Sequence, residues 1–118
     1  MTAPNIFTAT VCTAKSAHQL ATTSAAAIIT NAAASGKVFK VNSILAVNKS
    51  TDFADVTIDI FRSSVSYPLA FAITVPTKST LVVLGKDTPL YMEEGDILRI
   101  LSSAASTLNI TVVYEEVN

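Results

Sequence analysis

The chain has 118 residues and a net charge of −1, and half of its residues are hydrophobic while only 14% are charged. This length fits one domain, and the charged fraction lies well below the roughly 25% of ordinary soluble domains. Scattered lysines and arginines argue against a nucleic-acid groove, and the lack of a long uninterrupted apolar run argues against a membrane span.

The first 34 residues are dominated by alanine, threonine and serine. We expect an extended N-terminal arm or leader strands over residues 1–34, with strands near Ile6–Thr13 and Ala26–Thr30, because threonine and β-branched residues favour extended structure. Alanine-rich stretches also permit a helix, and a partly disordered terminus is the alternative. As an extended arm, this small-residue segment is suited to lie along the sheet edge of a neighbouring protein.

From residue 35 onward, apolar and polar residues alternate with the period of two that is typical of half-buried strands. Glycine, proline, serine and asparagine separate the runs at intervals that suit a sandwich or small barrel. We therefore predict an all-β fold, an antiparallel β-sandwich of jelly-roll type over residues 35–118, forming a single domain with the leader. The expected strands are Val38–Val47, Val56–Ile60, Tyr67–Val75, Leu81–Leu84, Ile97–Leu101 and Leu108–Tyr114.

The alternation also assigns side chains to faces. Tyr67, Phe71 and Tyr114 fall on the apolar faces of their strands, and we expect all three in the core. In the longest run, strict alternation puts Ile44 on the face opposite to the larger apolar residues Phe39, Val41, Leu45 and Val47. Asp59 alternates with buried-type residues and is expected on a solvent face.

The sequence offers little from which to build a catalytic site. His18 is the single histidine, and the single cysteine, Cys12, has no helix start or glycine turn near it that would lower its pKa. A nucleophile needs an adjacent base and an orienting group, and a lone histidine is more often a surface or interface residue. We therefore expect no enzyme activity.

The acidic run from Glu93 to Asp96 raises the question of a metal site. Calcium requires six or more converging oxygens, and the spacing of a calcium-binding loop is absent. A tight turn at Gly95, with acids that keep the loop solvated, is the simpler interpretation. Three glycines in total also leave no phosphate-binding loop, so no metal and no cofactor are expected.

Six apolar residues are candidates for contact with a partner. Phe53 falls in a loop, and Phe61 shares a strand face with polar residues, where an aromatic ring is unexpected in a monomer. Both rings would equally well cover an edge of the sandwich. The other four are the large side chains of the leader: Ile6, Phe7, Ile28 and Ile29.

Two stretches give the chain a resemblance to known proteins. Residues 76–84 (Pro-Thr-Lys-Ser-Thr-Leu-Val-Val-Leu) and residues 90–100 (Leu-Tyr-Met-Glu-Glu-Gly-Asp-Ile-Leu-Arg-Ile) form a packing and turn pattern. With the segments at residues 40–48, 54–58 and 110–116, this pattern resembles small β-sandwich structural proteins of tailed bacteriophage virions. It carries no active site.

The resemblance implies a virion structural protein. The expected role is a capsid cement or decoration protein on the outer surface of the head, which bridges and stabilises the major capsid protein, and the expected state is a homo-oligomer, with a trimer favoured. A neck, tail or fibre-base subunit that contacts other virion structural proteins is the alternative. A second class of function is a recognition module that binds glycans through its loops, although the chain has no tryptophan and few aromatic residues in loops for this purpose. No nucleic-acid or membrane partner is expected.

Overall fold

A computed structural model describes residues 11–85 and 87–118 of the chain. Ile6 and Phe7 lie outside the described residues. Of the strand expected at Ile6–Thr13, only residues 11–13 belong to the described part of the chain. No helix long and apolar enough to cross a membrane occurs in the described part.

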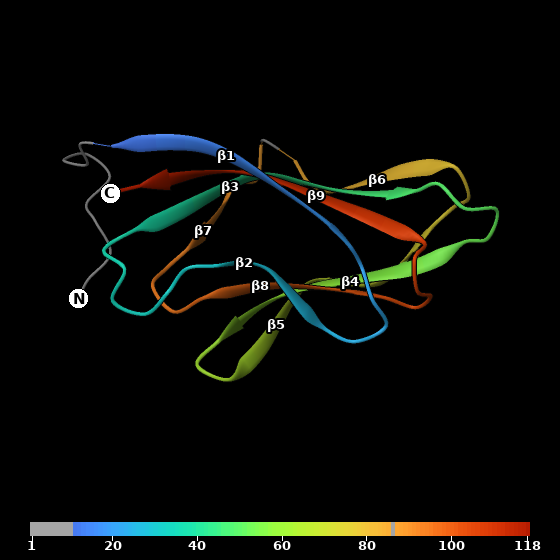
Figure 1. Ribbon diagram of the computed structural model, residues 1–118, viewed down its shortest axis with the longest axis horizontal. Helices are drawn as coiled ribbons and strands as arrows, with labels where there is room; N and C mark the ends of the chain where they lie inside the picture. The colour runs from blue at the N-terminus through green and yellow to red at the C-terminus, as the bar shows by residue number, and fades with distance from the viewer. Residues whose placement is uncertain (1–10, 86) are drawn as a thin grey trace.

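The described residues form nine strands, all paired in antiparallel fashion, which confirms the predicted all-β class (Figure 1). Two strands depart from the prediction. The sequence did not predict the short seventh strand, because three residues are too few to show a period, and the first strand was expected to end at Thr13 but continues to Leu20. The strands are β1 (Cys12–Leu20), β2 (Ala26–Thr30), β3 (Val38–Asn48), β4 (Ala54–Arg62), β5 (Val65–Val75), β6 (Ser79–Leu84), β7 (Leu90–Met92), β8 (Ile97–Ser102) and β9 (Leu108–Val117).

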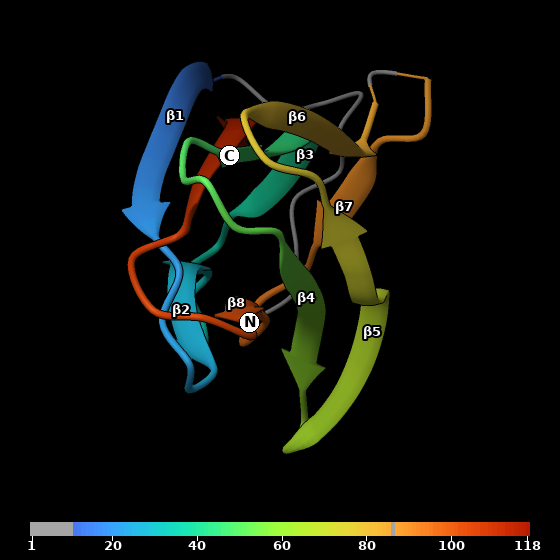
Figure 2. The same cartoon turned by 90° about the vertical axis from the view of Figure 1, so that its right-hand side faces the viewer.

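Two sheets face each other as a β-sandwich. The first sheet has the order β1-β9-β3-β6, with β7 also paired to β3, and the second has the order β2-β8-β4-β5. Because β6 and β7 pair with successive parts of β3, together they occupy the place of one strand. The result is two four-stranded layers connected as in a jelly roll, and Figure 2 shows β1 with β2 on one side and β5 with β6 and β7 on the other.

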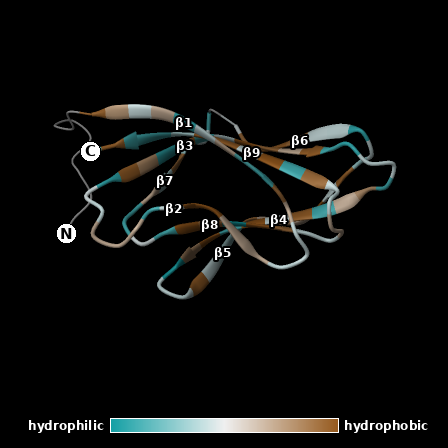
Figure 3. Cartoon of the chain, viewed as in Figure 1, coloured by the Kyte–Doolittle hydropathy of each residue, from teal (hydrophilic) through white to brown (hydrophobic). Residues whose placement is uncertain are grey.

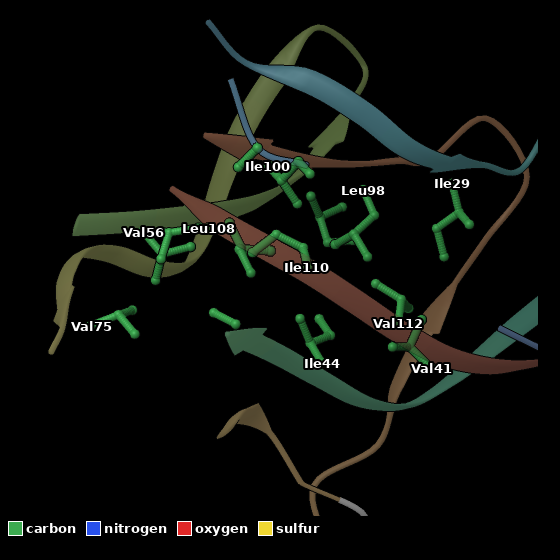
Figure 4. Close-up of a cluster of buried hydrophobic side chains, with 14 of the residues drawn as sticks. Ile29, Val41, Ile44, Val56, Val75, Leu98, Ile100, Leu108, Ile110 and Val112 are labelled. Carbon is green, nitrogen blue, oxygen red and sulfur yellow. The ribbon is translucent and has the colours of Figure 1, made fainter. Parts of the chain in front are cut away.

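The core lies between the layers and is built from aliphatic side chains of both sheets (Figure 4). In β4 the apolar residues Val56, Ile58 and Ile60 are buried, as the alternation predicted, although Asp59 between them is buried as well. In β8 every second residue is buried, a pattern that the nearly all-apolar sequence of this run did not show. Tyr114, also expected in the core, packs against it with its ring centroid 5.4 Å from that of Phe39. The largest fully buried side chains include Ile44, Ile58, Leu98, Ile100, Leu108 and Ile110.

A bulge in β3 corrects the predicted faces of that strand. The pairing of β3 with β9 shifts between Val41 and Ser43, so one residue is inserted and the side-chain alternation changes phase. Val41 and Ile44 are consequently both fully buried, whereas Leu45, expected beside Val41, is only half-buried. Strict alternation fails here because a bulge leaves no clear mark in the sequence.

The leader contributes one strand to each sheet. β1 is the end strand of the first sheet and pairs with β9 from Cys12 to Leu20. β2 is the end strand of the second sheet and pairs with β8. Of the two expected forms, arm or leader strands, the described part of the leader has the second, and β2 has the predicted bounds Ala26–Thr30.

Two fully buried asparagines connect the two sheets. Asn31, which follows β2, donates hydrogen bonds from its side chain to the carbonyl oxygens of Lys37, at 2.9 Å, and of Met92 in β7, at 3.2 Å. Asn48, at the end of β3, donates to the carbonyl oxygens of Asp52, at 2.8 Å, and of Val75 in β5, at 3.0 Å. Each amide therefore satisfies one buried carbonyl oxygen of the opposite sheet, that of Met92 or of Val75, and one carbonyl oxygen of a connecting loop.

Candidate assembly interface

The most conspicuous surface feature is β5, the end strand of the second sheet. Its five large odd-numbered side chains from Val65 to Ile73 are exposed, by 38% to 73%, and Figure 3 shows hydrophobic residues along this strand. Charged residues are absent from β5. We call this set the β5 patch: Val65, Tyr67, Leu69, Phe71 and Ile73.

The structure corrects the prediction that Tyr67 and Phe71 belong to the core, since their side chains are 53% and 73% exposed. Tyr67 pairs with Ile60, which is buried, so it lies on the core side of its sheet. The β4–β5 hairpin projects beyond the rest of its sheet in Figure 1, and Tyr67 remains 53% exposed. The alternation assigned the side of Tyr67 correctly, but it could not show where the opposite layer ends. It did not assign the side of Phe71, because the pairing with β4 shifts register next to it and Ala70, its neighbour, pairs with the buried Ile58.

A hollow of about 210 Å³ lies beside Tyr67 and Leu69 of the β5 patch. It is lined mostly by apolar side chains of β4, β5 and β7, among them Ile60, Tyr67, Leu69 and Leu90. Arg62 also lines it, but its guanidinium is held by Asp96, at 2.8 and 2.5 Å, and by Glu93, at 3.1 Å. The hollow is therefore an apolar surface whose one cation is already paired.

The backbone of β5 is poorly suited to accept a further strand at its free edge. Pro68 lacks an N–H group, and Ala72 has a positive φ of 50°. The pairing with β4 also shifts register on both sides of Ile58. Proline and bulges are devices that protect edge strands from continuous pairing, so the apolar side chains, and not the backbone edge, are what β5 presents.

The six interface candidates from the sequence have different environments. Ile29 is 7% exposed and belongs to the core, and Ile28 packs against it, which corrects both assignments because β2 is covered by the opposite sheet. Phe53, in the loop between β3 and β4, is 68% exposed. Phe61 is half-buried on the outer side of β4. Ile6 and Phe7 lie outside the described residues.

Phe61 belongs to a small cluster on the outer face of the second sheet. The Arg99 guanidinium lies 4.1 Å from the centroid of its ring, an attractive cation–π geometry. Arg99 also donates two hydrogen bonds to Asp59, at 2.9 and 2.6 Å. Asp59 is only 7% exposed, so it does not mark a solvent face as expected. The ring is covered by this ion pair, and it gives no indication of a partner.

The hydrogen bonds from Arg99, and a further one from Ser66, lower the pKa of the Asp59 carboxyl below its usual range. Glu116 has a lowered pKa for a similar reason, because Lys15 and Lys37 donate to it. In both cases the folded state binds a proton less readily than the unfolded state. The stabilisation is therefore complete above the unfolded pKa and is lost as the pH falls towards the folded pKa.

We expect the free energy of unfolding to decrease from about pH 5 downward. The Asp59→Asn variant is expected to be about 1–2 kcal/mol less stable at pH 7, because Arg99 loses its charged partner, and to lose less stability than the wild type between pH 7 and pH 3. Denaturant unfolding at the two pH values measures both effects. Asp52→Asn, at an exposed loop carboxylate, is the control. Equal acid sensitivity of Asp59→Asn and the wild type would contradict the pairing.

The acidic loop between β7 and β8 is held by protein groups. Asp96 is 1% exposed and accepts hydrogen bonds from Arg62 and from the Glu93 N–H, at 2.8 Å. A carboxylate oxygen of Glu94 accepts from the Gly36 N–H at 2.9 Å. Gly95 has a φ of 87°, in agreement with the predicted turn. The loop acids therefore do more than keep the loop solvated, since they fasten it to β4 and to the β2–β3 connection.

The chemically reactive side chains are far apart. Cys12 and His18 stand six residues apart on β1, a distance of about 20 Å along a strand. A hydrogen bond from Cys12 to Glu115, at 3.4 Å, raises the pKa of the thiol, and His18 Nδ1 lies 3.1 Å from the Thr111 hydroxyl oxygen. Among residues 11–85 and 87–118, no three histidine, cysteine, aspartate or glutamate side chains are grouped to hold a metal ion.

Comparison with known proteins gives one likeness of fold. No family model matches the chain, and no curated protein matches it. A solved structure from Bacillus, described as "Bacillus endospore appendages form a novel family of disulfide-linked pili", is similar with a TM-score of 0.58 and 20% identity, over 100% of this chain and 96% of that chain. At this identity the likeness shows the fold alone, and the resemblance to phage virion proteins stays a prediction.

Proposed function

We propose that this protein is a non-catalytic structural subunit that works as part of a regular, many-copy assembly on the outside of a particle or cell. The β5 patch is the observation that carries the proposal. Monomeric proteins rarely leave this many large apolar side chains of one strand uncovered, and here they lie on a chain with 14% charged residues and a net charge of −1. Little charge repulsion opposes contact between neighbours.

The proposed mechanism is additive. A standard interface of about 1,600 Å², somewhat more than half apolar, contributes roughly 20 kcal/mol before the costs of association are subtracted. Each contact then leaves a modest net stabilisation, which is repeated at every equivalent position of the assembly. A rigid sandwich suits this task because its surface is already shaped before binding, so little ordering cost arises on assembly.

The first specific form of the proposal is a capsid cement protein that bridges subunits on the outer surface of a phage head. The packing and turn pattern of residues 76–100 supports it, and a compact sandwich fits many equivalent lattice sites. A neck, tail or fibre-base position uses the same resemblance. Major capsid protein or other virion structural proteins would be the partners, with a trimer of this chain as the state that the sequence favoured.

The second form is a subunit of a surface filament, favoured by the likeness in fold to the Bacillus endospore appendage structure. That structure is described as a disulfide-linked pilus, whereas this chain has a single cysteine, Cys12. Its thiol is exposed but has a raised pKa, because of the hydrogen bond to Glu115. Because one cysteine forms at most one disulfide, it could link copies only in pairs, so a filament of this chain would be held chiefly by non-covalent contacts.

The absence of catalysis is part of the proposal. A dyad of Cys12 and His18 would require the two side chains to be within hydrogen-bond reach, and β1 holds them about 20 Å apart. The raised pKa of Cys12 also keeps its thiol protonated, and the thiolate is the nucleophilic form.

Immunogold electron microscopy tests the proposal and separates its forms. Antibodies against the purified full-length chain are applied to virus particles, cells and spores from the source that carries the gene. Regular label on particle heads supports the cement form, and label along filaments supports the appendage form. Label confined to the cell interior, with none on any particle or surface, would overturn the proposal.

A further inference from the structure

We propose that the free edge of β1 pairs with β1 of a second copy of this chain, so that the first sheets of two copies join into one continuous antiparallel sheet. This inference rests on the proposed function and deepens it by naming a partner and a contact. A two-fold contact takes the place of the trimer that the sequence favoured. The β5 patch lies on the opposite side of the sandwich (Figure 2), so it stays available for other copies.

The pairing of β1 with β9 is regular, and it fixes which backbone groups of β1 are free. It includes all nine residues of β1 without a register shift. At one end Val11 exchanges backbone hydrogen bonds with Asn118, and at the other the Ala21 N–H donates to the Leu108 carbonyl oxygen, all at 2.9 Å. Because hydrogen bonding to one neighbour alternates along an antiparallel strand, the odd-numbered residues bond to β9. The N–H and C=O groups of the even-numbered residues point away from β9 and form what we call the β1 edge: Cys12, Ala14, Ser16, His18 and Leu20.

The β1 edge is open within the part of the chain that the structure describes. No strand of residues 11–85 and 87–118 pairs with it, and Figure 2 shows β1 at the margin of the molecule. The features that protect β5 are missing, because β1 contains no proline and no residue with a positive φ. Lys15 is its one residue with a formal charge, and Glu116 neutralises it. A regular row of free donors and acceptors of this kind is the template to which an extended strand adds.

The other edges of the sandwich indicate β1 itself as the matching strand. β2 has only five residues and a register shift, β6 and β7 divide the other edge of the first sheet between them, and β5 contains Pro68. In a two-fold contact the same edge is used on both copies, so β1 meets a strand of equal length. A foreign strand is selected through pockets for its alternate side chains, and the mostly small side chains of β1 are poorly suited to form them.

Full overlap of two antiparallel β1 strands places the two-fold axis at Ser16, the middle residue of the strand. The residues of the β1 edge then stand opposite one another: Ser16 opposite Ser16 of the second copy, Ala14 opposite His18, and Cys12 opposite Leu20. Each such pair exchanges two backbone hydrogen bonds, about ten in all, which is the number found in a typical specific interface. No position opposes two charged residues, so this register carries no direct repulsion.

Sedimentation equilibrium of the full-length protein tests the contact through Ser16→Pro. Proline removes the free N–H of Ser16 but no hydrogen bond to β9, and an end strand tolerates proline where the N–H faces solvent. The wild type is expected to dimerise. Ser16→Pro is expected to raise the dimer dissociation constant at least about thirtyfold, because both hydrogen bonds at the axis are lost. Ser16→Ala keeps the N–H and is the matched control, which should stay within about threefold of the wild type. Circular dichroism with temperature shows whether each variant is folded.

Disulfide trapping tests the register and does not depend on the folding of the proline variant. In a Cys12→Ser background, Ser16→Cys places two thiols opposite each other at the axis, and mild oxidation is expected to give a covalent dimer. Ala14→Cys is the matched control on the same side of the same strand. Its two copies are offset by four residues, about 13 Å, which is too far for a disulfide, so this variant should stay monomeric under oxidation and denaturation.

Three results would overturn the inference. The first is a wild type that remains monomeric, which would leave the β1 edge to a strand of another protein. The second is an assembly that persists unchanged in a folded Ser16→Pro variant, since another surface would then build it. The third is equal trapping of Ser16→Cys and Ala14→Cys. None of these results bears on the immunogold test, so the two proposals can fail separately.

Discussion

Deletion of residues 1–34 is expected to abolish the cooperative thermal unfolding transition of this protein. The deletion removes β1, which pairs with β9 along nine residues, and β2, which pairs with β8. It also removes Ala21 and Ile29 from the core and the buried amide of Asn31. The remaining sheets would expose the edges of their central strands β9 and β8, so the loss affects pairing and packing together.

This expectation replaces the role that the sequence alone assigned to the leader. Small side chains suggested an arm that serves assembly and leaves the sandwich folded after truncation. The described part of the leader supplies instead one end strand of each sheet. Small residues are suited to that place too, since an end strand such as β1 has most of its side chains in solvent.

Circular dichroism with temperature measures the result, and point variants of the full-length chain separate packing from chain loss. Ile29→Ala is expected to cost about 2–4 kcal/mol, because it opens a cavity in the core. Ala27→Ser, at an exposed position of the same strand, should stay within about 0.5 kcal/mol. A truncated chain that retains the full transition would show that the sandwich is independent of the leader.

Much of the fold follows from short-range patterns. In β4, Val56, Ile58 and Ile60 are buried at every second position, as the alternation predicted. Such a pattern suffices because a regular strand fixes the side of each residue and one sheet covers that side throughout. β3 departs from it because of the bulge between Val41 and Ser43, which is set by pairing with β9 more than sixty residues away.

The candidate interface was harder to predict because it depends on where the opposite layer ends. Tyr67 and Phe71 have the pattern of core residues, and only the three-dimensional arrangement shows that they are exposed. The sequence signal for this surface was that β5 has apolar residues on both of its sides. In a monomeric domain this composition is typical of a central strand that is covered on both sides. An end strand with that composition is the surface that the proposed assembly contact would cover.

Polar contacts between distant residues were equally invisible in the sequence. Asp59 and Arg99 are 40 positions apart, and their pairing covers Phe61, which had been a candidate for partner contact. A charged residue in an alternating strand was therefore assigned to solvent, although the structure buries it. Alternation distinguishes two faces of a sheet but does not show what covers the outer one.

The buried amides of Asn31 and Asn48 support the second large prediction. Asn48→Ala is expected to cost about 2–4 kcal/mol, because it removes the amide donor of the Val75 carbonyl oxygen, one of the two donors of the Asp52 carbonyl oxygen, and the acceptor of the Ser50 N–H. Asn31→Ala should cost a similar amount through the carbonyl oxygens of Lys37 and Met92. Each loss corresponds to a decrease of about 10 °C in melting temperature for a domain of this size.

Denaturant unfolding of the two single variants and the double variant measures these costs, with Asn42→Ala as the matched control. Asn42 is half-buried and its side chain donates to Glu115 at 3.2 Å, so its loss should cost less than about 1 kcal/mol. The costs of Asn31→Ala and Asn48→Ala are expected to add, because the two amides satisfy separate sets of carbonyl groups. If either variant were as stable as Asn42→Ala, water would be able to replace the amide, and the two sheets would not depend on it for their connection.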